Sequence, residues 1–268
     1  MAKNIINPDR ISLTTHQLFL GFSETDKIIG NSTGFIYQKE DRWYIITNYH
    51  VVSGRNPETK ECLSEELAIP NILSTTFWIK DKPGHRERKI INLYNKDNNP
   101  VWIEHPQFGS KVDVVAIPIP EEIIKGNNLF PINKIDFDNQ FKCEVADDIF
   151  IIGYPFLEQE YLELPIWKKA SIASEPDVNR DQLPKFLVDT ATRKGLSGSP
   201  AIMQRTGFNQ PVGSNPNIIS DDAIFGRIRK FAGIYSGRIG KDESKAQLGI
   251  IWKTRVIDEI LNSEKINI

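Results

Sequence analysis

The chain has 268 residues, of which 40% are hydrophobic and 25% are charged, as expected of a globular protein with one large domain or two small lobes around a cleft. The formal net charge of −2 at pH 7 gives no electrostatic reason to expect nucleic acid or an anionic membrane as a partner. No stretch approaches the roughly 18 apolar residues of a membrane span, because the longest, 149–157, is interrupted by glycine and proline.

The first half of the chain is predicted to form short strands. Its apolar runs, alternating or continuous, are separated by glycine, proline, asparagine and aspartate, which is the pattern of strands joined by turns. Residues 53–72 are polar and rich in glutamate, so we expect a surface loop there. The predicted strands are 16–22, 31–38, 42–48, 74–80, 88–94, 100–104 and 112–119.

The basic stretch 80–89 interrupts this series and has two interpretations. Its lysines and arginines suggest a nucleic-acid surface, but aspartate and glutamate break up the charge and no aromatic run accompanies it. Pro83 and Gly84 at its centre are typical of the tip of a hairpin. We therefore favour a hairpin over a nucleic-acid-binding role.

The second half continues the pattern and ends in a helix. Residues 174–184, which are polar and contain two prolines, and residues 204–222, which are rich in proline, asparagine and glycine, are predicted to be loops. In the segment 254–261, four apolar residues recur at helical spacing. The predicted strands are 140–152, 164–173, 185–189, 199–203, 223–236 and 247–253.

Residues 194–200, with the sequence Lys-Gly-Leu-Ser-Gly-Ser-Pro, place Ser197 in a glycine-rich frame ahead of an apolar pair. A serine hydroxyl is a poor nucleophile unless a base takes its proton and backbone donors stabilise the resulting oxyanion. Small flanking residues permit a tight turn that directs one hydroxyl and two N–H groups at one point. Because glycine and serine are common in ordinary loops, this motif alone does not distinguish a nucleophile from a loop residue.

Of two further motifs, one contains a candidate base and the other a carboxylate. The apolar segment 43–49 delivers His50 to the end of a strand, and Asp113 opens the nearly all-apolar segment 112–118. The order histidine, aspartate, serine is one of the chain orders in which a catalytic triad is built. A lone histidine at a strand end is otherwise a hydrogen-bonded core residue, and a lone aspartate is an exposed carboxylate. Exposure fits Asp113 poorly, because its valine neighbours suggest burial, where an unpaired carboxylate is costly.

These motifs, with the segments 30–36 and 151–155 beside them, resemble those of the trypsin-like (chymotrypsin-fold) serine peptidases. Within this family, the motifs are most similar to those of the bacterial HtrA-like branch, without its PDZ domain. The resemblance covers roughly residues 15–260. It implies a serine endopeptidase that acts through an acyl-enzyme intermediate on protein or peptide substrates, without a cofactor.

The resemblance also implies the fold. It predicts an all-β chain of two six-stranded antiparallel β-barrels with a C-terminal helix, forming one peptidase domain over residues 1–268. Residues 15–130 would form the first barrel, 136–253 the second, and 254–263 the helix.

By the resemblance, Ser197 is the nucleophile, His50 the general base, and Asp113 the group that orients the imidazole and stabilises its cation. The oxyanion hole would consist of the main-chain N–H groups of Gly195 and Ser197. Ser199 is the competing nucleophile, but the Gly-x-Ser-Gly frame places Ser197 at the turn.

One departure from the family concerns activation. In digestive relatives, the residue directly before the nucleophile is an aspartate. This aspartate binds the ammonium group of a newly cleaved N-terminus, which activates the zymogen. This chain has Leu196 there, so we expect no activation by N-terminal cleavage, and any control would come from loop ordering or a regulatory protein partner.

The specificity pocket is predicted from its offset to the nucleophile. The residue six positions before the serine forms the base of the pocket in the family, and here it is an uncharged alanine, so we expect small to medium apolar side chains at the cleaved position. A carboxylate reaching the pocket from Asp189, Asp221 or Asp222 would instead favour basic residues. The predicted substrate-binding residues are Ala191, Thr192, Ile234, Tyr235, Ser236 and Gly249.

The remaining signals concern environment and alternative functions. Cys62 and Cys143 are expected to be free thiols rather than a bridge, and the N-terminus lacks a hydrophobic signal core, so we expect a cytoplasmic protein. No histidine or cysteine pair has metal-ligand spacing. The alternative function is an inactive binding or scaffold protein that keeps the fold, although all three triad residue types are present.

Overall fold

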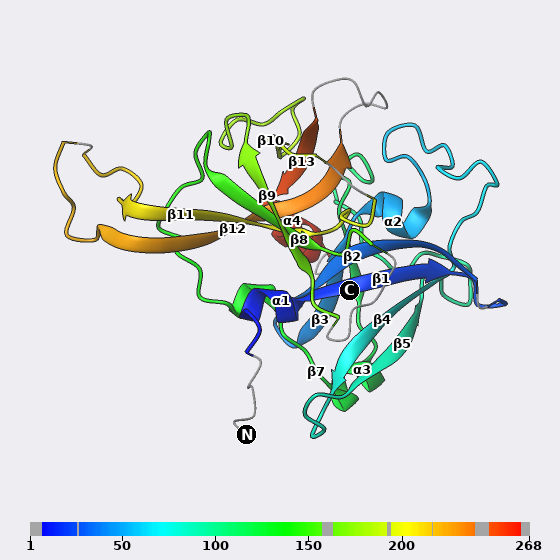
Figure 1. Ribbon diagram of the computed structural model, residues 1–268. Helices are drawn as coiled ribbons and strands as arrows, with labels where there is room; N and C mark the ends of the chain where they lie inside the picture. The colour runs from blue at the N-terminus through cyan, green and yellow to red at the C-terminus, as the bar shows by residue number, and fades with distance from the viewer. Residues whose placement is uncertain are drawn as a thin grey trace.

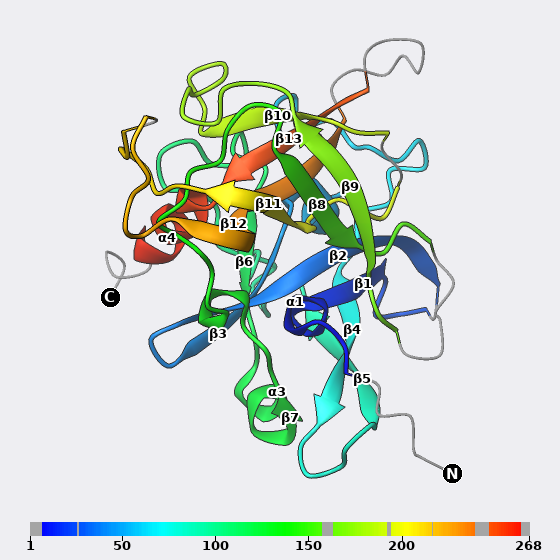
Figure 2. The ribbon, with the colours of Figure 1, turned by 60° about the vertical axis from the view of Figure 1, so that its left-hand side comes forward.

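The computed structural model describes residues 7–25, 27–156, 163–191, 194–215, 217–238 and 247–263. Two antiparallel sheets, one from each half of the chain, account for most of this structure (Figures 1 and 2). The all-β fold with a C-terminal helix is confirmed.

The first half forms a seven-stranded sheet in the order β5-β4-β1-β2-β3-β6, with β7 paired to β4. It is therefore one strand larger than the predicted six. Its strands are β1 (Thr15–Gly21), β2 (Ile28–Lys39), β3 (Arg42–Thr47), β4 (Ile72–Ile79), β5 (Arg86–Asn92), β6 (Val115–Pro118) and β7 (Asn127–Asn128).

The second half forms a closed six-stranded barrel in the order β10-β13-β12-β11-β8-β9, as predicted. Closure pairs each strand on both sides along part of its length and so limits exposed sheet edges. Its strands are β8 (Asp148–Gly153), β9 (Ile166–Ile172), β10 (Lys185–Asp189), β11 (Pro200–Asn209), β12 (Ile224–Arg238) and β13 (Leu248–Lys253).

The helices are short, and the last is the predicted C-terminal one. It buries Val256, Ile257, Ile260 and Leu261 on one face, as their spacing indicated. Among the described residues, no helix has the length and apolar character needed to cross a membrane. The helices are α1 (Arg10–Thr14), α2 (Tyr49–Ser53), α3 (Glu121–Gly126), the 3-10 helix η1 (Ile132–Lys134) and α4 (Arg255–Ser263).

Several predicted boundaries are wrong. Residues 100–104 form isolated bridges and not a strand, and the strand predicted to start at residue 140 begins only at Asp148. The predicted hairpin is confirmed: β4 and β5 pair, and Gly84 adopts a positive φ of 78° in the connection between them.

The largest difference is an arm built by β11 and β12, part of which was predicted to be the loop 204–222. Beyond a register shift between Ala201 and Ile202, the two strands pair without interruption out to Asn209 and Ile224, and Phe208 lies directly opposite Phe225. The paired strands project from the barrel as a two-stranded arm (Figure 1). Main-chain pairing thus stabilises as a strand the residues 204–209, which the sequence predicted to be part of a loop.

One hydrophobic cluster contains residues of both halves. It packs the inner side of β2 and β3 against β8, β11, β12 and α4, and it thereby fixes the two halves against each other. Its fully buried members include Phe35, Tyr44, Ile46, Val112, Val114, Ile152, Ile202, Ile234, Trp252 and Val256.

Candidate active site

His50 lies just after β3, in the first turn of α2, rather than at the end of the strand as predicted. Asn48 stands at the N-cap with extended backbone angles, so the chain turns directly from strand into helix. The main-chain N–H of His50 donates to Oδ1 of Asp113 over 2.9 Å, and its ring Nδ1 lies 2.7 Å from Oδ2 of the same carboxylate. Since a carboxylate only accepts, Nδ1 carries the proton and Nε2 of the neutral ring is free to accept one.

Asp113 is only 4% exposed, and its polar atoms have partners from both halves of the chain. Besides the two bonds from His50, its Oδ2 accepts a hydrogen bond from the Ser236 hydroxyl of β12 over 3.0 Å. Its main-chain carbonyl accepts one from the Asn48 amide over 2.6 Å. The carboxylate is therefore buried and partnered, as the predicted orienting group would be, and is not an exposed charge.

The pKa of His50 is shifted by two opposed effects. Burial lowers the pKa, while the negative charge of Asp113 and the hydrogen bond to it raise it, and the two contributions from Asp113 together exceed the effect of burial. The net pKa lies above the ordinary value of 6.5.

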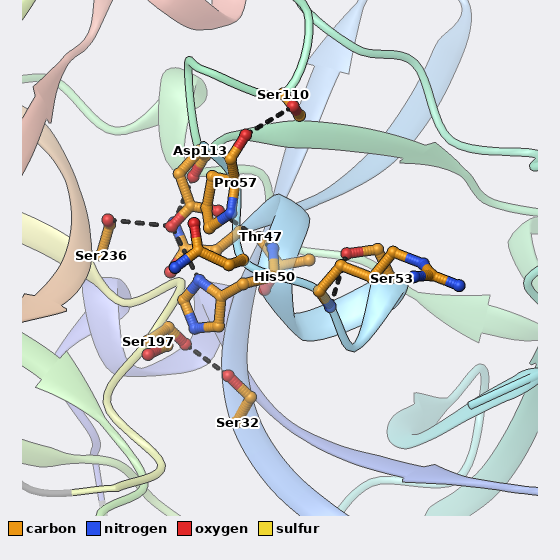
Figure 3. A network of polar contacts seen from close by, with 12 residues as sticks. Ser32, Thr47, His50, Ser53, Pro57, Ser110, Asp113, Ser197 and Ser236 are labelled. Carbon is orange, nitrogen blue, oxygen red and sulfur yellow. Dashed lines mark hydrogen bonds and ion pairs between the residues drawn. The ribbon is translucent and has the colours of Figure 1, made fainter. Parts of the chain in front are cut away.

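Ser197 sits on a turn that only glycine neighbours allow. Gly195 and Gly198 have φ values of 92° and 82°. A Cβ on Gly195 would overlap the carbonyl oxygen of Tyr154, and one on Gly198 would overlap that of Thr33. The turn leaves Ser197 partly exposed, and Figure 3 shows the ring of His50 between Asp113 and Ser197.

The competing serine, Ser199, lies two residues further on and is buried. It is 0% exposed, and its Oγ has no hydrogen-bond partner within the described structure. A substrate cannot reach this hydroxyl, so the geometry favours Ser197. The described residues show no hydrogen bond between Oγ of Ser197 and the ring of His50, a contact that in enzymes without substrate is often loose.

Two main-chain donors beside Ser197 are unoccupied. The carbonyl of Leu196 accepts the N–H of Ser199 over 3.1 Å, which turns the N–H of Ser197 the opposite way across the planar trans peptide. Neither this N–H nor that of Gly195 donates a hydrogen bond to any residue that the structure describes. These are the two positions at which the sequence predicted the donors of an oxyanion hole.

Strand β2 of the first half holds this turn in place. Ser32 Oγ and the N–H of Thr33 both donate to the carbonyl of Ser197, over 2.6 and 2.9 Å. Thr33 Oγ1 donates to the carbonyl of Gly195 over 2.7 Å and accepts the N–H of Tyr154 over 3.0 Å. We call Ser32 and Thr33 the β2 clamp.

The predicted substrate-binding residues are only partly brought together. Ser236 bonds to Asp113, Ala191 is exposed, and Thr192 lies outside the described residues. Ile234, Tyr235 and Gly249 are buried beneath the surface between β12 and β13.

The roles of Asn48, Ser32 and Thr33, and the bond from Ser236 to Asp113, were missed by the sequence analysis. The only signal was the segment 30–36, which resembles the family pattern but whose polar residues had no assigned role. Gly237 was also missed, and a Cβ there would lie 3.8 Å from Oγ of Ser197.

Two other histidines and both cysteines lie outside the site around Ser197. His16 is buried with Nδ1 3.0 Å from the carbonyl oxygen of Thr76, and His105 bonds to Glu259. Cys62 and Cys143 are free thiols, and burial raises the pKa of Cys143 to about 11. Among the described residues, no group of three histidine, cysteine, aspartate or glutamate side chains could hold a metal ion.

Comparison with known proteins adds to this geometry. A family model described as a trypsin-like peptidase domain matches residues 32–208, a range that includes His50, Asp113 and Ser197. The search of curated proteins returned no match.

Among solved structures, the chain is similar to the active form of the Rv3671c protease from M. tuberculosis. The two share 16% identity and a TM-score of 0.47, over 94% of this chain and 81% of that one. The inactive form of the same protease gives 16% identity and a TM-score of 0.45, over 94% and 89% of the two chains.

Proposed function

Because the chain belongs to the family of trypsin-like peptidases, we propose that it is a serine endopeptidase that hydrolyses peptide bonds through His50, Asp113 and Ser197. The observation that carries the proposal is the arrangement around the partly exposed hydroxyl of Ser197. A histidine held by a buried, fully partnered carboxylate lies on one side of it, and two unoccupied main-chain N–H groups lie in the same turn.

In the proposed reaction, Nε2 of His50 takes the proton of Ser197 as Oγ attacks the scissile carbonyl. The N–H groups of Gly195 and Ser197 stabilise the oxyanion that forms. The imidazolium then gives its proton to the leaving amine, and the C–N bond breaks to leave an acyl-enzyme. Water, activated by His50, hydrolyses this ester and restores the serine.

Asp113 has a positioning role in this scheme. Its two carboxylate oxygens bond to the main chain and to the ring of His50, so the ring is fixed in both orientation and tautomer. Cytoplasmic residence and control by a protein partner remain predictions from the sequence.

Substitution of the two neighbouring serines tests the proposal. Ser197→Ala should abolish peptide cleavage and labelling by a fluorophosphonate probe, which reacts only with an activated serine. Ser199→Ala is the matched control and should leave both unchanged, because its buried hydroxyl has no partner to lose. Loss of activity in Ser199→Ala alone, with Ser197→Ala still active, would contradict the assignment. A folded wild-type protein that the probe does not label would indicate an inactive scaffold.

A further inference from the structure

We propose that Tyr235 closes the specificity pocket beside Ser197 and restricts the cleaved position of the substrate to glycine, alanine or serine. This inference rests on the proposed peptidase activity and names its substrate class.

The main chain of Tyr235 is tied directly to the nucleophile turn. Its N–H donates to the carbonyl of Ser199 and its carbonyl accepts the N–H of Gly198, both over 2.9 Å. The next residue, Ser236, bonds to Asp113. The side chain of Tyr235 therefore begins immediately behind the catalytic groups, where the side chain of a bound substrate would enter.

The ring of Tyr235 extends from β12 across to β13. Its register partner on β13 is Ile251, but the ring reaches Gly249, two residues away along that strand. A Cβ added to Gly249 would lie 2.6 Å from Cε2 of Tyr235, and 3.2 and 3.3 Å from the Cγ2 atoms of Thr190 and Val188. The tyrosine ring thus occupies the space that the missing side chain of Gly249 leaves.

The space beneath the ring is already filled. Tyr235 is 1% exposed, Val188 and Leu196 are buried in the same hydrophobic cluster, and Thr190 is buried as well. A leucine or phenylalanine side chain could enter only by displacing this packed ring, whereas glycine, alanine and serine end before they reach it. The sequence alone favoured small to medium apolar residues, and the ring removes the medium ones.

The charges near the pocket also argue against a large basic side chain at the cleaved position. Among the described residues that follow β10, Ala191 carries no charge, and Asp189 is exposed at the end of that strand while its neighbour Val188 faces the interior. A buried lysine or arginine head without a counter-ion is strongly disfavoured.

The test compares cleavage of peptides that differ only at the residue before the scissile bond: glycine, alanine, serine, leucine, phenylalanine and lysine. Rates are expressed per fluorophosphonate-labelled site, so that misfolded protein does not count. For the wild type we expect kcat/KM at least 10-fold higher for alanine than for leucine or phenylalanine. Tyr235→Ala should raise kcat/KM for leucine and phenylalanine at least 10-fold.

Tyr235→Phe keeps the ring and removes only the hydroxyl, so leucine and phenylalanine should still be rejected, which separates the effect of the ring from that of the hydroxyl. If Tyr235→Ala does not fold, Tyr235→Val serves as a milder truncation. The cleavage profile of the wild type tests the inference even without either variant. A labelled wild type that prefers leucine, phenylalanine or lysine overturns the inference and leaves the proposed function standing. A truncated variant that is labelled but still rejects large residues likewise overturns the inference without affecting the proposed function. A wild type without labelling overturns the proposed function itself.

Discussion

The pKa of His50 determines the pH at which the proposed reaction can run. Only the neutral imidazole accepts the serine proton, and Asp113 holds the pKa above 6.5 despite burial. We therefore expect kcat/KM to be low in acid, to rise as pH passes through this raised pKa, and to level off at mildly alkaline pH. The measurement is the pH profile of peptide cleavage.

Asp113→Asn checks the cause of this shift. Loss of the carboxylate charge should lower the pKa of His50 and reduce kcat by about 10,000-fold, as in other triads of this type. Asp189→Asn, which changes an exposed carboxylate, should leave the profile unchanged. An activity maximum near pH 4 in folded protein would rule out histidine as the base.

His16 affects stability rather than catalysis. Burial, together with the charge of Arg86, lowers its pKa to about 4 against the opposing effect of its hydrogen bond to Thr76. Because the unfolded chain binds a proton near pH 6.5 and the folded one near 4, stability is lost as pH falls between these values. The loss from pH 7.5 to pH 5 should be about 2 kcal/mol.

Denaturant unfolding at these two pH values measures this effect. In His16→Gln, the free energy of unfolding should depend less on pH by about the same 2 kcal/mol. The control is His85→Gln, on the exposed β4–β5 connection, which should retain the wild-type dependence. An unchanged dependence in His16→Gln would show that other groups cause the loss.

At the scale of elements, strand β2 sets the shape of the nucleophile turn. Thr33→Val removes the hydrogen bond to the carbonyl of Gly195 and leaves the N–H of Tyr154 without its acceptor. We expect kcat to fall about 10- to 100-fold with KM little changed, below the full effect of losing one oxyanion donor. Steady-state kinetics check this, with Thr206→Val on the exposed face of β11 as control. A rise in KM alone would place Thr33 in substrate binding instead.

The elements that the sequence predicts best are those whose apolar pattern and turn signals agree. Strand β10 matches its predicted range, and β3 is one residue shorter than predicted. Strand β12 was predicted almost at its observed bounds, but the outer part of β11, residues 204–209, was predicted to be loop because the glycines, prolines and asparagines of 204–222 are local turn signals. Its pairing depends on a partner strand more than a dozen residues away, which a local pattern does not reveal.

The candidate site shows the same division. Ser197, His50 and Asp113 were predicted from motifs that are continuous in sequence, and the structure brings His50 and Asp113 into contact. The bond from Ser236 to Asp113 joins residues 123 positions apart, and the β2 clamp joins residues about 165 apart. Pairings of this kind depend on how the halves pack, so the sequence predicts Ser236 near the pocket but gives no sign of its bond.

At the scale of the whole molecule, the halves share one core and should unfold together. Ile46 lies in the first half and Ile202 in the second, and both belong to the shared cluster. Truncation to alanine at either site should cost about 2–5 kcal/mol and lower the same single transition. Calorimetry checks this by comparing calorimetric with van't Hoff enthalpies. Two separate transitions, only one of which moves in each variant, would show that the halves are independent.

The β2 clamp also bears on how such a chain can change by descent. The turn that carries Ser197 is bonded to side chains some 165 positions earlier, so we expect a change in one of the two stretches to require a compatible residue in the other. A chimera joined between residues 126 and 136 from two diverged parents would combine a clamp from one with a turn from the other. In such a hybrid the clamp and the turn would not match. We therefore expect the hybrid to fold but to lack the proposed peptidase activity, unless both stretches came from the same parent.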